Sequence, residues 1–242
     1  MRKRNTVGDD VFIATFNEKN RTVSDEHLTD IFTEVGRRYG YDDVDAEFAD
    51  LRDFKCRWQR SYTWIRFVIS DYLDRAPDEV LHDLAEVLFA KITGDDREYS
   101  DVFVRYLTDP ALSKVNRKDF LKRSRNLGKT SIGDYHDLND CVNRLRDQGL
   151  IPYDLECELR WDFTETPKAS GCSVLQKVVW VNKYLDQKGV PEHVLDYCVY
   201  AMLAHIIAGF NNRDEAEYIA LIERHPMKRD AEAWLAREGL FL

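Results

Sequence analysis

The stretch that decides the fold reads Pro191-Glu-His-Val-Leu-Asp-Tyr-Cys-Val-Tyr-Ala-Met-Leu-Ala-His-Ile206. Its side chains recur at helical spacing and form one stripe, made of Val194, Tyr197, Cys198, Ala201, Met202 and His205. The proline at the start suits a first helical turn, because its missing N–H has no intrahelical partner there. The stretch is therefore predicted to be an amphipathic helix whose apolar stripe faces a sheet.

An ungapped match relates this stretch to an earlier one, Pro77-Asp-Glu-Val-Leu-His-Asp-Leu-Ala-Glu-Val-Leu-Phe-Ala-Lys-Ile92. Pro, Val, Leu, Ala and Ile coincide in the two stretches, and the agreement continues outward in the same order. Upstream, ISDYLD (69–74) matches VNKYLD (181–186), and downstream FVRYLTDP (103–110) is similar to YIALIERHP (218–226). Colinear matches over about 110 residues predict an internal duplication.

Each copy is predicted to contain a helix, two or three short strands and further helices. The first helices, 27–39 and 137–148, are amphipathic. The strand candidates alternate in polarity or are rich in β-branched and aromatic residues, and they span 45–48, 52–58, 64–69, 155–163 and 174–181. The predicted fold class is α+β, with two tandem units, 1–112 and 134–242, in which helices pack on a small mixed sheet. A basic linker, 113–133, is expected between them.

Composition places the chain among ordinary globular proteins. Its 242 residues are 44% hydrophobic and include 5 Trp, 12 Tyr and 12 Phe, enough for one large core or two small ones. The formal net charge of −9 disfavours binding of nucleic acid or anionic membrane through the whole surface.

Cysteine spacing and hydropathy bear on the compartment. The five cysteines include no C-x-x-C pair, which predicts reduced thiols: Cys56, Cys141, Cys157, Cys172 and Cys198. The longest apolar run, 197–210, is shorter than the roughly 20 residues that a membrane span needs. We therefore expect a cytoplasmic protein with no membrane partner.

The second copy resembles the gluzincin-type zinc metallopeptidases, in particular the minigluzincins and related prokaryotic predicted peptidases. The helix of that family typically reads P-x-x-V-x-D-Y-V-x-Y-H-E-L-x-H, and a third ligand in H-x-x-x-F, then E-R-x-x-P and W-L, follow it. The matching residues here are Pro191, Val194, Asp196, Tyr197, Val199, Tyr200, Leu203, His205, Tyr218, Glu223, Arg224, Pro226, Trp234 and Leu235. The resemblance extends over roughly 150–236 and, more faintly, over 40–110. It implies a zincin-like fold for both units.

In the H-E-x-x-H motif, two histidines four residues apart bind zinc from one helix face, and the Glu takes a proton from the zinc-bound water. The resemblance places the first ligand on Ala201, the catalytic Glu on Met202, the second ligand on His205 and the third on Asp214. In the first copy the same positions are Val87, Leu88, Lys91 and Tyr99. These replacements predict a catalytically inactive homologue, without bound zinc, that serves as a binding or scaffold protein for an unidentified protein or peptide.

Two alternatives stay open. One is a metal-dependent hydrolase with a rearranged zinc site around His205 and Asp214, to which His225 or Glu223 adds a displaced ligand. The other is binding of nucleic acid or an acidic partner through the basic residues of 113–133, which are Lys114, Arg117, Lys118, Lys122, Arg123, Arg125 and Lys129. In that case Lys122, Arg123 and Arg125 are the expected polyanion contacts. Only one aromatic residue, Phe120, accompanies them, which favours a solvated charged surface.

Overall fold

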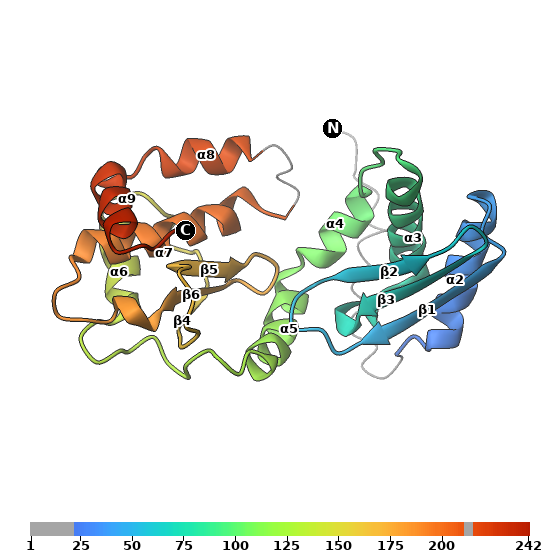
Figure 1. Ribbon diagram of the computed structural model, residues 1–242, viewed down its shortest axis with the longest axis horizontal. Coiled ribbons are helices and arrows are strands. Elements are labelled where there is room, and N and C mark those ends of the chain that lie inside the picture. The colour runs from blue at the N-terminus through green and yellow to red at the C-terminus, as the bar shows by residue number, and fades with distance from the viewer. Residues whose placement is uncertain (1–21, 211–214) are drawn as a thin grey trace, which may run out of the picture. The chain divides into compact units, whose positions relative to one another are not determined.

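The computed structural model describes residues 22–210 and 215–242, and the chain divides into two compact units, Met1–Leu112 and Ser113–Leu242 (Figure 1). Each unit contains one three-stranded mixed sheet with helices packed against it. The predicted α+β class is therefore confirmed, and so is the expectation of small mixed sheets.

In the described part of the first unit, a helix leads into the sheet. Its elements are α2 (Asp25–Arg38), β1 (Asp43–Ala49), β2 (Cys56–Arg60), β3 (Trp64–Ser70), the short 3₁₀ helix η1 (Asp71–Leu73), α3 (Asp78–Thr93) and α4 (Asp101–Leu107). The strand order is β1-β3-β2, in which β1 is parallel to β3 and β2 is antiparallel to it. Helix α5 (Pro110–Arg123) runs across the boundary between the two units.

Alternation along β3 builds the core of the first unit. Ile65, Phe67 and Ile69 are buried, while the residues between them are partly exposed. Phe67 meets Phe32 of α2 edge-on at 4.9 Å and Phe89 of α3 at 5.2 Å between ring centroids. The apolar face of β3, set by its two-residue period, therefore packs against the apolar faces of α2 and α3 and forms one core layer.

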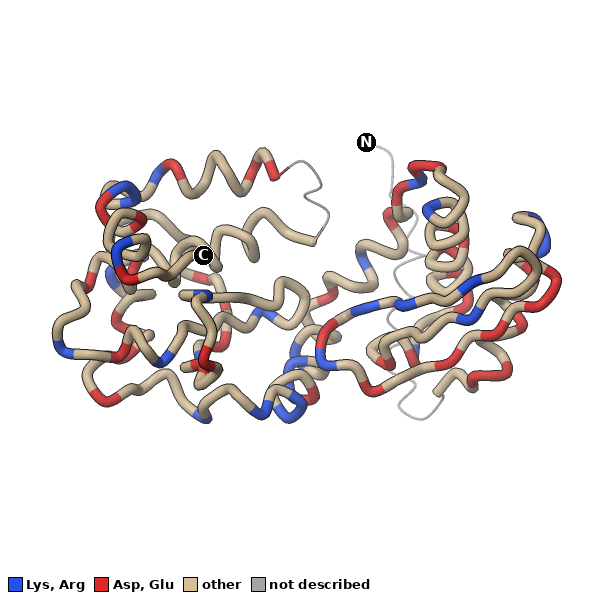
Figure 2. Tube along the Cα trace, in the orientation of Figure 1, with Lys and Arg blue, Asp and Glu red and all other residues tan. Residues whose placement is uncertain are grey.

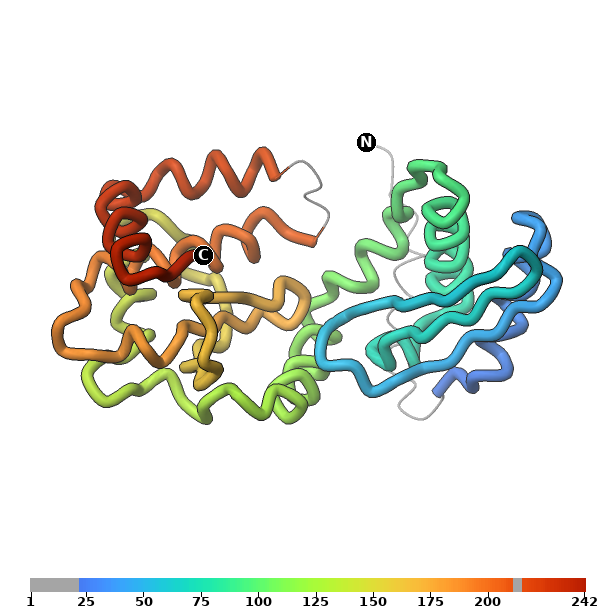
Figure 3. Tube along the Cα trace, viewed as in Figure 1, coloured from blue at the N-terminus to red at the C-terminus, as the bar shows by residue number. Residues whose placement is uncertain are grey.

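The second unit repeats this order of elements. They are α6 (Leu138–Asp147), β4 (Glu158–Asp162), β5 (Ser170–Ser173), β6 (Val178–Asn182), the 3₁₀ helix η2 (Lys183–Leu185), α7 (Glu192–Ala208), α8 (Ala216–Ile222) and α9 (Lys228–Arg237). The strand order is β4-β6-β5, again with one parallel and one antiparallel pair. The chain end returns to this sheet, where Phe241 bridges Lys168 just before β5 (Figure 3).

One strand prediction was wrong in its boundaries. Residues 174–181 were expected as a single strand, but β6 begins only at Val178 and Ser170–Ser173 is a separate strand, β5. The turn lies at 174–177, where Lys177 adopts a left-handed φ of 51°. A lysine in that conformation is uncommon, so sequence alone gave no signal for a hairpin turn there.

Helix α7 is more deeply buried than the predicted amphipathic helix with a single apolar stripe would be. Most of its length, from Val194 to Ala204, is buried, because β5 and β6 contact it on one side and α6, α8 and α9 on others. A helix enclosed on all faces is apolar all round, so the predicted single stripe underestimated its burial. No helix in the described part of the chain is both long and apolar enough to cross a membrane.

The basic segment 113–133 packs within the second unit. Its first half is the end of α5, where Phe120 is fully buried with its ring 6.1 Å from that of Trp180. Arg117 donates from Nε to the carbonyl of Gln176 at 2.7 Å. Farther along, Leu127 bridges Asp162 at the edge of the sheet. The segment predicted as a linker thus contributes structure to the second unit.

Candidate functional site

The carboxyl-terminal half of α7 holds the positions at which the resemblance places the zinc ligands. Ala201 is fully buried and Met202 is 4% exposed. Both side chains belong to the hydrophobic core of the second unit. Neither supplies a nitrogen or carboxylate oxygen of the kind that binds catalytic zinc.

His205 stands where the resemblance places the second zinc ligand. Its ring is half-buried and stacks on Tyr218 of α8, with centroids 3.6 Å apart and planes 9° from parallel. Burial lowers the pKa of His205, against the opposing effect of Glu215. The imidazole is therefore uncharged near neutral pH and is held flat against an aromatic ring.

The other donors considered for a rearranged site are dispersed or not described. Asp214 lies outside the described residues. Glu223 is ion-paired with Lys228. His225 is buried with its ring 5.3 Å from those of both Tyr197 and Tyr200. Since α7 rises about 1.5 Å per residue, that contact lies about 7–12 Å along the helix from His205.

The equivalent positions of the first unit also lack a ligand set. Val87 and Leu88 are buried, and Lys91 is exposed near the end of α3. Tyr99 stacks on Phe103 at 4.3 Å with the planes 9° apart. Across residues 22–210 and 215–242, no three side chains of His, Cys, Asp or Glu gather closely enough to hold a metal ion. The described residues therefore do not fit a three-ligand zinc site.

Asp196, one of the residues that match the family helix, has a structural partner. Its buried carboxylate accepts three hydrogen bonds from Arg144 of α6, at 2.7, 2.9 and 3.1 Å. This bidentate geometry raises the pKa of Arg144, first through the hydrogen bonds to Asp196. The pair holds α6 against α7, and the Asp196 carboxylate is occupied by its hydrogen bonds to Arg144.

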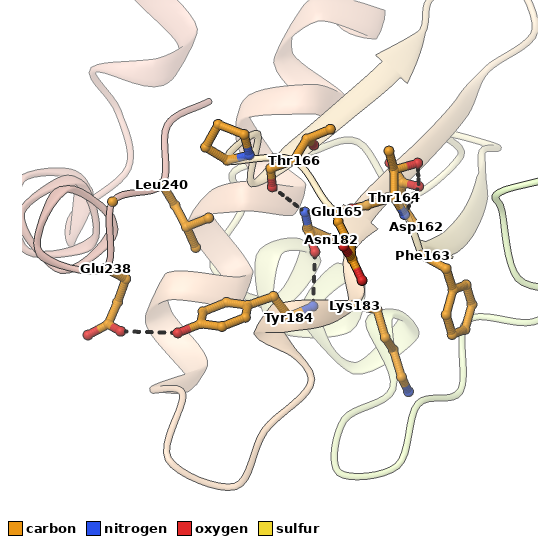
Figure 4. Close-up of a pocket in the computed structure, with 12 residues that line it drawn as sticks. Asp162, Phe163, Thr164, Glu165, Thr166, Asn182, Lys183, Tyr184, Glu238 and Leu240 are labelled. Carbon is orange, nitrogen blue, oxygen red and sulfur yellow. Dashed lines mark hydrogen bonds between the residues drawn. The ribbon is translucent and has the colours of Figure 1, made fainter.

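A pocket opens elsewhere in the second unit, at the carboxyl ends of the parallel strands β4 and β6. Its volume is about 550 Å³. The lining residues are Asp162, Phe163, Thr164, Glu165, Thr166, Pro167, Asn182, Lys183, Tyr184, Glu238, Gly239 and Leu240 (Figure 4). Ligand sites of mixed and parallel sheets commonly lie beyond the carboxyl ends of their strands.

Asn182 at the end of β6 shapes the loop that lines this pocket. Its side-chain amide donates to the carbonyls of Thr166 at 2.9 Å, Lys168 at 3.1 Å and Thr164 at 3.4 Å. The side-chain oxygen of Asn182, Oδ1, accepts a hydrogen bond from the backbone N–H of Tyr184 at 2.9 Å (Figure 4). This site was not predicted from the sequence. The available signal was a polar residue, Asp162 or Asn182, at the end of each buried strand.

The predicted polyanion contacts lie on or just after α5. Basic residues gather along α5 and the segment that follows it (Figure 2). Lys118, Lys122 and Arg125 are exposed, whereas Arg123 is partly buried. Lys114, exposed one turn before Lys118, pairs with Glu156 at 3.2 Å. Residues four apart share a helix face, so the lysines form a basic stripe, defined here as Lys114, Lys118 and Lys122 with Arg125 beyond the helix end.

All five cysteines are free thiols, and none sits in an activating environment. Cys141 and Cys198 are buried and the others are partly buried. Burial raises the pKa of Cys157 and Cys172 to about 11 and that of Cys56 and Cys198 to about 12. A thiol with a raised pKa is a poor nucleophile near neutral pH.

Comparison with known proteins adds no relative: no family model, curated protein or solved structure matches this chain.

Proposed function

We propose that this protein is a non-catalytic binding protein built from two copies of a minigluzincin-like unit. The observation that carries the proposal is the burial of Ala201 and Met202 in the core, at the positions of the first zinc ligand and the catalytic Glu. A buried methionine cannot act as a general base for a zinc-bound water. The same order and direction of strands in both sheets supports descent of the two units from one ancestor.

The edge of the second sheet is where an extended peptide would bind. Strand β5 is an edge strand that contacts α7, and the hydroxyl of Ser170 donates to the carbonyl of Cys198 at 3.2 Å. An edge strand leaves backbone groups that a peptide can pair with by adding a strand. A peptide held there, beside a helix without the motif, would be bound and not cleaved.

Metal content tests this proposal and the rearranged hydrolase together. The purified full chain, dialysed against a weak chelator, is expected to retain far less than one zinc per molecule by elemental analysis. The double variant Ala201→His/Met202→Glu restores the motif and is expected to gain zinc. About one zinc per chain in the original protein, lost in His205→Ala, would overturn the proposal in favour of a metal-dependent hydrolase.

A second function, binding of a polyanion, is favoured by the exposed basic stripe on α5. Each phosphate contact contributes about 0.9 to the slope of log affinity against log salt for duplex DNA. The variant Lys118→Gln/Lys122→Gln/Arg125→Gln should therefore lower the slope for a DNA duplex by about 2–3. The matched control, Lys168→Gln/Lys188→Gln/Arg229→Gln, removes the same charge from exposed positions outside the stripe and should lower the slope less. Equal affinity of the stripe variant and the original protein would exclude this role for the stripe.

A further inference from the structure

The pocket at the ends of β4 and β6 exposes aromatic rings that a core would normally cover. Phe163 is 58% exposed and Tyr184 is 50% exposed, and both line the pocket. In the view of Figure 4, Glu165 lies between the two rings, and the Tyr184 hydroxyl reaches Glu238 across the pocket at 3.5 Å. Exposed rings that flank a carboxylate offer stacking surface and negative charge at the same place.

The first unit shows that this exposure is not forced by the fold. Tyr72 and Tyr184 are each the second residue of the 3₁₀ helix after the central strand. Tyr72 is 5% exposed, and its hydroxyl donates to the carbonyl of Arg52 at 2.7 Å. The loop of the first unit therefore covers its tyrosine, whereas the second unit leaves Tyr184 at an open pocket.

The charges around the pocket are predominantly negative. Asp162 is buried and accepts hydrogen bonds from neutral donors, the Asn126 amide at 2.7 Å and the Thr164 hydroxyl at 2.7 Å. Glu165 is exposed at the mouth of the pocket, and Glu238 lies across from it. Glu238 also pairs with Arg237, whose Nε lies 3.8 Å from Glu238 Oε1. Among the described residues that line the pocket, no basic side chain pairs with Asp162 or Glu165.

Lys183 is the one lysine among the described residues that line the pocket, and it already has partners. The Lys183 ammonium pairs with Asp134 at 2.9 Å and with the buried carboxylate of Asp186. It also lies 5.6 Å from the Trp161 ring centroid and 5.8 Å from that of Phe163. The lysine is thus compensated by two carboxylates, and the potential of the pocket is set by its remaining acids.

The pocket is also pre-shaped. Three carbonyls of its loop are fixed by the single amide of Asn182, and Phe241 donates its N–H to the carbonyl of Pro167 at 3.0 Å. A site whose walls are held before binding loses less conformational entropy when a ligand enters.

We infer that this pocket binds an organic cation, the guanidinium or ammonium group of a basic side chain or of a free amine. The cation stacks on Tyr184 and pairs with Glu165, while Phe163 and Glu238 line opposite ends of the pocket (Figure 4). The inference does not depend on the metal-site proposal, since none of these residues belongs to the positions on α7. A zinc-containing protein would leave it unchanged.

The test uses the full chain and three probes in calorimetric titrations at moderate salt. An acetylated tetra-arginine amide should bind saturably, and the citrulline peptide of the same length, which lacks the charge, should bind at least about tenfold more weakly. Arginine amide distinguishes the source of the cation: comparable affinity indicates a free amine, and binding of the peptide alone indicates a side chain of a partner. Either result supports a cation site.

Variants locate the binding. Glu165→Gln/Glu238→Gln should lower the affinity for the arginine peptide about tenfold or more. Tyr184→Ala should lower this affinity several-fold, whereas Tyr184→Phe should leave it unchanged. The matched control, Asp140→Asn/Glu217→Gln, removes the same charge from exposed positions outside the pocket and should change affinity by less than about twofold. Thermal unfolding of each variant checks that it is folded.

Three results would overturn the inference. They are absence of saturable binding, equal affinity for the arginine and citrulline peptides, and equal loss in the pocket variant and the charge-matched control. The last would mean that the acidic surface as a whole attracts the peptide.

Discussion

Asp196, one of the residues that carry the sequence resemblance, forms a buried ion pair that packs α6 on α7. Its carboxylate is 8% exposed and is bonded to Arg144, of which 31% is exposed. Removing one partner of such a pair leaves the other poorly compensated. The residue therefore contributes to stability whether or not the unit binds a peptide.

We predict that Asp196→Ala lowers the free energy of unfolding of the second unit by about 2–4 kcal/mol. Asp43→Ala is the control, because Asp43 pairs with Arg66 at 2.8 Å but is 60% exposed, and its loss should cost less than about 1 kcal/mol. Urea unfolding followed by circular dichroism measures both. Similar small losses in the two variants would show that the buried pair is not a stabilising contact.

His225 gives the stability of the second unit a pH dependence. Burial lowers its pKa, Asp196 opposes this effect and His193 adds to it, while the rings of Tyr197 and Tyr200 pack on the imidazole. Its buried Nδ1 has no hydrogen-bond partner in the described structure. A histidine with a lowered pKa in the folded state binds its proton more readily when unfolded. Its contribution to stability is therefore lost as pH falls below about 6.5.

The predicted outcome is a decline in unfolding free energy of the original protein from about pH 7 to about pH 5, reduced in His225→Phe. The phenyl ring keeps the contacts with the two tyrosines and cannot be protonated. His82→Asn, at a partly exposed position on α3, serves as the control and should leave the pH profile unchanged. Parallel profiles of the original protein and His225→Phe would contradict the assignment.

At the scale of elements, close approach of α2 to its neighbours depends on Gly36. A Cβ placed there would lie 2.8 Å from Val44 Cγ2 and 2.9 Å from Phe89 Cζ. Helix propensity alone favours Ala over Gly by about 1 kcal/mol. Overpacking in a closed core costs about 1–3 kcal/mol, and the buried Val44 and Phe89 leave little room for relaxation.

Gly36→Ala is accordingly expected to destabilise the first unit by about 1 kcal/mol or more, despite the better helix former. Glu34→Ala, an exposed position on the same helix, should change stability by less than about 0.5 kcal/mol. Chemical unfolding of the two variants distinguishes packing from propensity. A gain of stability in Gly36→Ala would mean that α2 can move away from β1 and α3.

The ends of an element were predicted well from the sequence where interactions between near neighbours in the chain set them, and poorly where distant residues set them. The helices observed as α2, α3, α6 and α7 lie within two residues of their predicted ends, because helical period and capping are local. The strands differ more: 52–58 was predicted where β2 begins at Cys56, and 155–163 where β4 begins at Glu158. Strand ends are set by pairing with β3 and β6, which a local pattern does not contain.

For the whole molecule, the two units have separate cores with the same strand order. Leu81 and Leu195 occupy matching positions on α3 and α7, and both are fully buried. A cavity-forming substitution in one core is expected to destabilise only the unit that contains it, as in independent domains.

Leu81→Ala and Leu195→Ala should each cost about 2–5 kcal/mol within the unit that contains it. Hydrogen exchange measured by mass spectrometry is expected to rise in peptides of α3 and β3 for the first variant. For the second variant, the rise should be in peptides of α7 and β6. Each variant is the control for the other. Equal acceleration in both units after either substitution would show that the chain unfolds as one cooperative body.

The sequence by itself determined the α+β class, the positions of the main helices and the apolar side chains at Ala201 and Met202, since side-chain type and short-range period are readable without a structure. Only the tertiary structure decided that His205 stacks on Tyr218, that 174–177 is a turn, and that the basic segment packs in the second unit. It also decided the pocket at the ends of β4 and β6, which joins residues from 162 to 240. These features arise from contacts between residues far apart in the chain, and hydrophobic period does not encode which distant partners meet.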